Sequence, residues 1–190
     1  MNPSWISLSE KKLWPDTSHK ERDAFYQAGH AVVAVLESLG VIQVSIREEE
    51  GASSWIDVSY PNFAQSRLNR SVMARREAKS VIRALLAGPA AQERYDFGTP
   101  VPHCSPPDFD LLAPRMMDHE AVWRAIALAG KISSDSPTLI RSLWRQVSRL
   151  IHKREVWSAI DAVASALLLN GELTGQEVCD VGNHAMRSTQ

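Results

Sequence analysis

Residues 24–38, AFYQAGHAVVAVLES, decide how the rest of this 190-residue chain is interpreted. Alanines and valines recur there at helical spacing, which predicts a helix over residues 21–39 with an apolar stripe along one side. Ser18 and Glu21 have the spacing of a capping box at the start of this helix, and Gly40 is typical of a C-terminal cap. The sequence therefore predicts an amphipathic helix that ends at Gly40.

A small β region is predicted directly after this helix. Residues 41–46 alternate between apolar and polar side chains, and residues 55–60 form a second strand-like run that Pro61 ends. An acidic turn containing Gly51 separates the two runs. The pattern predicts a hairpin, or two edges of a small sheet.

The rest of the chain is predicted to be mostly helical. The helical pattern over residues 66–95 is interrupted near Gly88-Pro89, because proline lacks the amide donor that a helix interior uses. Thr174 and Glu177 form another capping-box pair and open a short last helix. The other predicted helices cover residues 108–132, 137–152 and 155–169.

These elements predict a mainly α (α+β) fold with one domain over residues 19–184. Residues 1–18 are predicted to be an irregular N-terminal segment, and residues 185–190 a disordered tail. No internal repeat and no low-complexity tract divides the chain further.

Composition and charge are those of an ordinary soluble globular protein, with 44% hydrophobic and 23% charged residues and a net charge of −1. We therefore expect no nucleic-acid partner. The longest apolar runs are too short or too interrupted to span a bilayer. Cys104 and Cys179 are too few for a disulfide framework, so we expect a reducing, cytoplasmic location.

The chemistry-bearing part of the first helix is the five-residue frame from Tyr26 to His30. Residues four apart on a helix share a face, and zinc peptidases use this spacing in the motif H-E-x-x-H. In that motif two histidines hold the metal, and the glutamate after the first activates the bound water. In this chain the frame reads Tyr26, Gln27, Ala28, Gly29, His30.

The residues around this frame resemble the A-Y-H-E-A-G-H-A-V-V-A segment of the FtsH-type AAA zinc proteases. Further segments are similar in the same order along the chain. Residues 85–98 resemble L-L-A-G-R-A-A-E-E…F-G, and residues 164–178 resemble the closing A-x-x-L-L…L-T-G-x-E-V. The similarity covers about residues 20–182 and implies a helical metallopeptidase-like domain, without the ATPase module, because no Walker motif is present.

The frame departs from the family at the two positions that matter most for catalysis. Tyr26 replaces the first histidine and Gln27 replaces the catalytic glutamate, whereas His30 matches the second histidine. The resemblance assigns the third zinc ligand to Asp108, or alternatively to Asp110. With a ligand and the base replaced, we expect a pseudo-peptidase that acts as a binding or regulatory module and holds no cofactor.

An alternative is an active metal-dependent hydrolase with a rearranged zinc site. His103 and Cys104 lie just before Asp108 and could complete a metal site with His30 if their loop folds over the helix. Without such a site, His30 is expected to bond Tyr26, Gln27 or Asp108, and the Tyr26 ring to fill the space of the lost ligand.

Partners are expected to be extended peptides or another protein. The strand containing Trp55, Ile56 and Val58 corresponds by resemblance to the strand that borders the cleft in active relatives, where it pairs with extended substrate. The alternative for these residues is an ordinary half-buried strand. A further alternative is a subunit that tunes active proteases of the same family, and the oligomeric state is left open.

Overall fold

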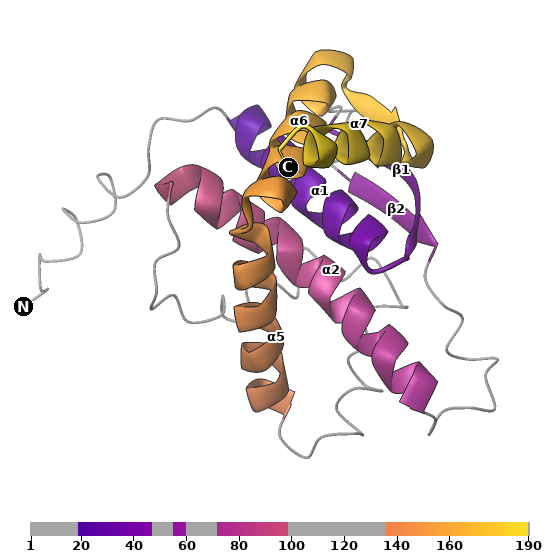
Figure 1. Ribbon diagram of the computed structural model, residues 1–190, viewed down its shortest axis with the longest axis vertical. Helices are drawn as coiled ribbons and strands as arrows, with labels where there is room; N and C mark the ends of the chain where they lie inside the picture. Colours follow the sequence, from indigo (N-terminus) through magenta and orange to yellow (C-terminus); the bar gives the residue numbers. More distant parts are fainter. Residues whose placement is uncertain (1–18, 47–54, 60–71, 99–135, 190) are drawn as a thin grey trace, which may run out of the picture.

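A computed structural model of the chain describes residues 19–46, 55–59, 72–98 and 136–189 (Figure 1). The elements, in chain order, are α1 (His19–Leu36), β1 (Gly40–Ser45), β2 (Trp55–Ser59), α2 (Val72–Phe97), α5 (Ser136–Ile151), α6 (Arg154–Asn170), β3 (Glu172–Thr174) and α7 (Gly175–Arg187). The predicted mainly α (α+β) class is confirmed. The segment 1–18 and the helix predicted over 108–132 lie outside the described residues.

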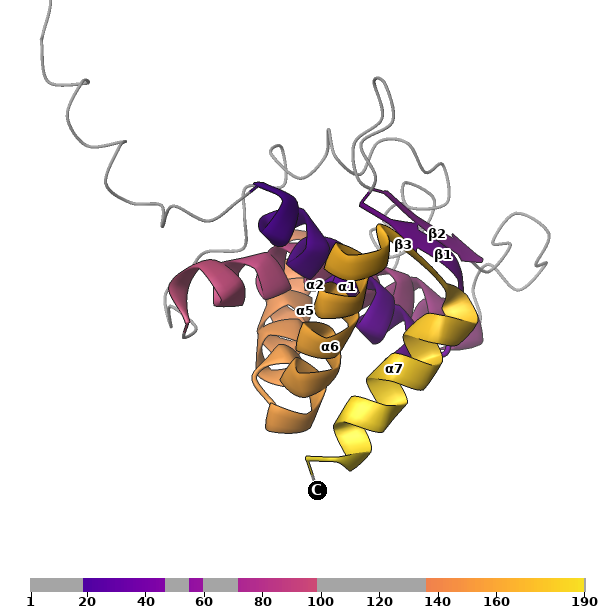
Figure 2. The ribbon, with the colours of Figure 1, turned by 90° about the horizontal axis from the view of Figure 1, so that it is seen from above.

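Helix α1 is the central element of the fold. It contacts α2, α6, α7 and both β1 and β2 (Figures 1 and 2). The sequence predicts one apolar stripe, yet every residue from Gln27 to Ala34 is buried. Helices and sheet cover α1 from several sides, so its alanines and glycine bring neighbouring backbones close rather than facing water.

The end of α1 differs from the prediction. The helix ends at Leu36, and the residue in the left-handed conformation is Ser38, with φ 61°. The Leu39 amide donates to the Ala34 carbonyl at 2.8 Å and the Ser38 amide to the Val35 carbonyl at 3.0 Å, which is the Schellman pattern. The predicted cap at Gly40 is therefore wrong, since Gly40 already begins β1.

Helix α2 runs through Gly88 and Pro89 without a break, so the predicted interruption there is wrong. Proline removes one internal hydrogen bond, the one that the Leu85 carbonyl would accept. The packing of α2 against α1 holds the helical path here. An ideal Cβ on Gly29 of α1 would lie 2.6 Å from both the Ala87 carbonyl oxygen and the Ala91 Cβ.

The sheet has the order β2-β1-β3, and both pairings are antiparallel. The predicted hairpin is present, with Val41 opposite Val58 and Val44 opposite Ile56. The register shifts between Val41 and Gln43, so a bulge lies at Ile42. Strand β3 was not predicted: its three residues pair with β1 through contacts distant in sequence.

The C-terminal helices largely follow the sequence pattern. The Gly171 amide caps α6 from a left-handed conformation, φ 81°, and Thr174 with Glu177 forms the predicted capping box of α7. Helix α7 continues to Arg187, so residues 185–187 are helical rather than part of a disordered tail. Within the described residues, no helix is long and apolar enough to cross a bilayer.

Candidate functional site

The five residues from Tyr26 to His30 lie in the middle of α1, at its contact with α2. Gln27 and His30 are buried, with 4% and 6% of their surfaces exposed, and Tyr26 is half-buried. Two polar side chains so deep in the fold need specific partners, because burying an unpaired polar group is costly.

His30 is held by the backbone of α2. Its Nδ1 lies 2.7 Å from the Ala84 carbonyl oxygen. A carbonyl oxygen only accepts, so Nδ1 carries the proton of the neutral ring and Nε2 keeps its lone pair. Burial lowers the pKa of His30 from 6.5 to about 4, against the smaller opposing effect of the Ala84 hydrogen bond. The imidazole is therefore neutral at pH 7.

Gly88 provides the surface on which the His30 ring lies. An ideal Cβ at Gly88 would be 2.3 Å from Nε2, 2.5 Å from Cδ2 and 2.8 Å from Cε1 of His30. Such similar distances to three consecutive ring atoms place that Cβ over the face of the ring. The absence of a side chain at position 88 thus lets the imidazole rest on the helix backbone.

Tyr26 contacts the same imidazole from its own helix. The two ring centroids are 4.6 Å apart and the planes meet at 81°, an edge-to-face arrangement. The Tyr26 ring, expected where the motif has its first histidine, therefore lies against the His30 ring. His30 bonds the Ala84 carbonyl, a partner that residue spacing alone does not reveal, and the expected partner Asp108 lies outside the described residues.

The metal-ligating capacity of the described part of the chain is small. It contains no group of three or more His, Cys, Asp or Glu side chains placed to hold an ion. His30 fits a zinc ligand in one respect, because ligating histidines usually donate their other N–H to a carbonyl or carboxylate. One imidazole is fewer than the three protein ligands of a catalytic zinc. His103, Cys104, Asp108 and Asp110 lie outside the described residues.

Strand β2, the predicted peptide-binding strand, contacts α1 and has β1 as its only hydrogen-bonded neighbour among the described residues. Val58 is buried and Ile56 half-buried, and both belong to or pack against the core, whereas Asp57 is exposed. Their side chains thus serve packing, as in the alternative interpretation of this strand. Among the described residues, no strand pairs with the other edge of β2. The side chain of Trp55 lies outside the described set.

Polar and aromatic contacts hold the first turns of α1 in place. These contacts were not predicted from the sequence. Arg22 bonds the buried Asp96 carboxylate at 2.8 Å, and Phe25 stacks on both Tyr95 and Trp157 at 4.1 and 5.5 Å between centroids. These contacts join α1 to the end of α2 and to α6. They fix the position of the frame one turn further along α1.

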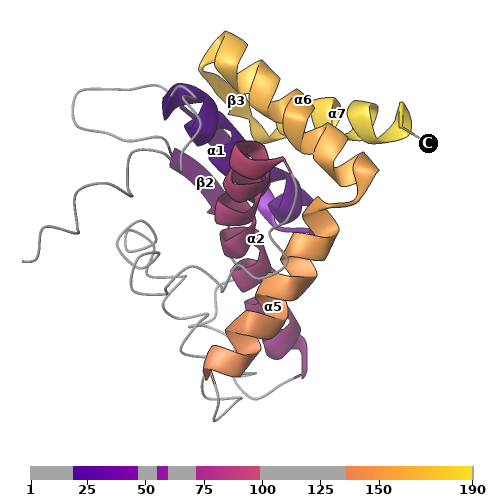
Figure 3. The same ribbon diagram turned by 90° about the vertical axis from the view of Figure 1, so that its left-hand side faces the viewer.

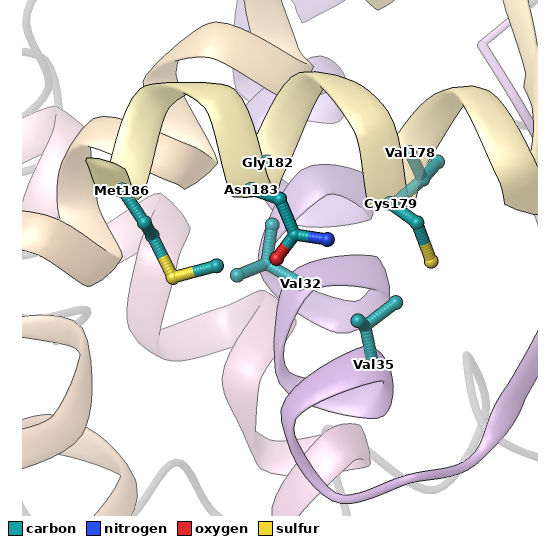
Figure 4. A pocket seen from close by; sticks show the side chains of 7 residues that line it. All are labelled: Val32, Val35, Val178, Cys179, Gly182, Asn183 and Met186. Atoms are coloured by element: carbon teal, nitrogen blue, oxygen red, sulfur yellow. The ribbon is translucent and has the colours of Figure 1, made fainter. Parts of the chain in front are cut away.

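A small concavity lies between α1 and α7 (Figure 4). It measures about 200 Å³, including space open to solvent, and its walls are mostly apolar, with Val32 and Val35 from α1 and Val178, Cys179 and Met186 from α7. The Cys179 thiol is free. The described lining of this groove contains no charged side chain and no histidine.

No protein-family model matches this chain, and it has no significant similarity to any curated protein. Its function is therefore inferred from the residues of the frame and from their geometry.

Proposed function

We propose that the chain is a catalytically inactive FtsH-like pseudo-peptidase that acts as a protein-binding or regulatory module. The observation that carries the proposal is Gln27, an amide buried beside His30 at the position where the family has its general base. An amide does not titrate near neutral pH, so it cannot take the proton of an attacking water. Position 27 therefore lacks the base that the family mechanism uses.

The second support is that the frame itself supplies only one metal ligand. Tyr26 could replace the first histidine only as a phenolate, and a phenol has a reference pKa of about 10. Its ring instead lies edge-on against His30. The frame therefore presents one neutral imidazole where the motif requires two.

A binding role draws support from the edge of β2. Only one edge of β2 is paired among the described residues. An unpaired antiparallel edge offers alternate amide and carbonyl groups to an extended peptide, whose affinity then comes from main-chain hydrogen bonds. This mode of binding needs neither a metal nor a base. The loss of the catalytic residues is thus compatible with retained recognition.

Metal analysis of the purified chain tests the inactive state. We expect no stoichiometric zinc, and we expect Tyr26→His with Gln27→Glu to gain zinc binding, because the new histidine would stand one turn before His30. The matched control is Tyr26→Phe with Gln27→Met, which changes the same positions without adding a ligand. A reverted chain that binds no zinc would show that the frame does not have the family geometry.

Peptide binding tests the module itself. Fluorescence polarisation with a pool of labelled extended peptides should identify a ligand, and methylation of its alternate backbone amides should abolish binding, because these amides make the ladder bonds. Equal affinity for the methylated peptide would refute recognition at the strand edge.

One observation favours the alternative function, a metal-dependent hydrolase with a rearranged zinc site. The tautomer of His30 is the one that leaves Nε2 available to a metal. The remaining ligands would be Asp108 with His103 or Cys104. Stoichiometric zinc in the unmodified chain, lost on His30→Ala and accompanied by peptide hydrolysis, would establish this alternative and exclude the pseudo-peptidase.

A further inference from the structure

The solvent side of α5 is uniformly polar and basic. Five exposed residues follow one another at helical spacing along it: Arg141, Ser142, Arg145, Gln146 and Arg149. None is acidic and none is apolar. Arg141, Arg145 and Arg149 are four residues apart, so their Cα atoms advance by about 6 Å along the helix axis at each step.

The opposite side of α5 fixes which face looks outward. Ile140, Leu143, Trp144, Val147 and Ile151 are all buried in the core, against α2 and α6. In two views α5 forms an outer edge of the fold (Figures 1 and 3). The helix cannot turn its basic side inward without exposing this apolar row.

Positive charge is concentrated in this part of the chain. Residues 136–154 contain five lysines and arginines and no aspartate or glutamate. Since the whole chain carries −1, the other residues together carry −6. Arg141, Arg145, Arg149, Lys153 and Arg154 are exposed, and within the described ranges none of them forms an ion pair. We expected no nucleic-acid partner because the net charge of the whole chain is close to zero. That net charge does not reveal the local excess of positive charge in residues 136–154.

We propose that the basic face of α5, defined as Arg141, Ser142, Arg145, Gln146 and Arg149, binds double-stranded DNA in the major groove. An α-helix with its side chains is about 10–12 Å wide, and the major groove is about 12 Å wide. Arginine is the side chain best suited to phosphate and to guanine, glutamine pairs with adenine, and serine bonds either. The face thus combines phosphate contacts with side chains that reach base edges.

Other anionic partners fit this face less well. Insertion of a helix into an anionic membrane needs exposed apolar side chains, and the exposed large hydrophobic residues of the described structure all lie outside α5. Single-stranded nucleic acid is bound by stacking on exposed aromatic rings, whereas Trp144 is buried. A duplex groove needs only the convex polar helix that is present.

Fluorescence anisotropy of the full chain with a short labelled DNA duplex tests the proposal. At about 50 mM salt we expect binding that weakens steeply as salt rises, with a log–log slope of about 0.9 for each phosphate contacted. Arg141→Gln with Arg145→Gln and Arg149→Gln should weaken binding more than about 10-fold and lower that slope by about 3. The control, Lys20→Gln with Arg76→Gln and Arg187→Gln, removes equal charge from other exposed positions and should leave affinity within about 3-fold.

Circular dichroism verifies that both triple variants are folded, which we expect because every substituted side chain is exposed. Equal weakening by the two triple variants would overturn the proposal, because binding would then follow net charge alone. Absence of duplex binding at low salt would overturn it too. Tighter binding to single-stranded DNA or to phosphatidylserine vesicles than to the duplex would also overturn the proposal, because neither ligand has a major groove.

Discussion

Replacement of Gly88 by alanine tests the placement of His30 most directly. In an unhindered helix interior, glycine to alanine stabilises by about 1 kcal/mol. At Gly88 the new Cβ would lie 2.3 Å from His30 Nε2, so the ring must move away. Overpacking of this kind costs about 1–3 kcal/mol, and weakening the bond to the Ala84 carbonyl about 1 kcal/mol more. The net expectation is a loss of about 2 kcal/mol from the free energy of unfolding.

The effect of Gly88→Ala on the free energy of unfolding should have the opposite sign when the imidazole of His30 is absent. In a His30→Ala background, Gly88→Ala should stabilise by about 1 kcal/mol, because only the helix propensity remains. The coupling energy between the two positions is then about 3 kcal/mol, which a double-mutant cycle isolates from the separate cost of the His30→Ala cavity.

Urea denaturation followed by circular dichroism measures all four chains. Gly182→Ala on α7 is the matched control, because its Cβ would meet the Ala159 Cβ at 3.9 Å, an ordinary contact, and should stabilise by about 1 kcal/mol. If Gly88→Ala stabilises the unmodified chain as much as this control does, the His30 ring does not lie on Gly88. The geometry given for the candidate site would then be refuted.

Three further predictions address pH, a helix end and a close backbone contact. Burial lowers the pKa of His30 to about 4, so between pH 6.5 and 4 the imidazole binds a proton only in the unfolded chain. The free energy of unfolding should therefore fall by about 3 kcal/mol as the pH drops from 6.5 to 4. His30→Gln should remove this fall. Ser38→Gly should raise the free energy of unfolding by about 0.5–1 kcal/mol, since Ser38 has φ 61°. Gly175→Ala should cost at least about 3 kcal/mol, because its Cβ would lie 1.8 Å from the Val41 carbonyl oxygen.

Each of these has a direct measurement and a matched control. Chemical denaturation of the unmodified chain and of His30→Gln at several pH values tests the pH prediction. The same dependence of the free energy of unfolding on pH in both chains would contradict it. Ser38→Ala controls for the side chain in the second, since alanine keeps the Cβ that the left-handed conformation disfavours. Thermal melts of Gly175→Ala and of its exposed neighbour Gln176→Ala decide the third, and equal melting temperatures would refute the close contact.

Local sequence signals predicted the parts of the fold that depend on neighbours along the chain. Thr174 and Glu177 form their capping box because both partners lie within one helical turn. The antiparallel pairing of β1 with β2 followed from the alternation in residues 41–46 and the strand-like run in residues 55–60. The prediction of a helix cap at Gly40 was wrong. It relied on the preference of glycine for left-handed conformations, but Ser38 is the residue with φ 61°, and Leu39, which follows it, is buried in the core.

Contacts between distant segments decided what local signals could not. Pro89 is a helix breaker in isolation, and the packing of α2 against α1 overrides it. Strand β3 has three residues and no recognisable pattern of its own, yet its pairing with β1 completes the sheet. The partners of His30, Ala84 and Gly88, are more than fifty residues away along the chain.

Residue types alone set the chemistry that is available to the candidate site. Whether a group can titrate or ligate is a property of its side chain, so Gln27 in place of a base and Tyr26 in place of a ligand have the same consequence in any fold. The state of His30 instead depends on tertiary packing, because its tautomer, its lowered pKa and its position over Gly88 arise from burial and from a carbonyl of another helix. The basic face of α5 also depends on tertiary packing. The spacing of its arginines can be read from the sequence, but these arginines face solvent because the opposite face of the helix packs against the core.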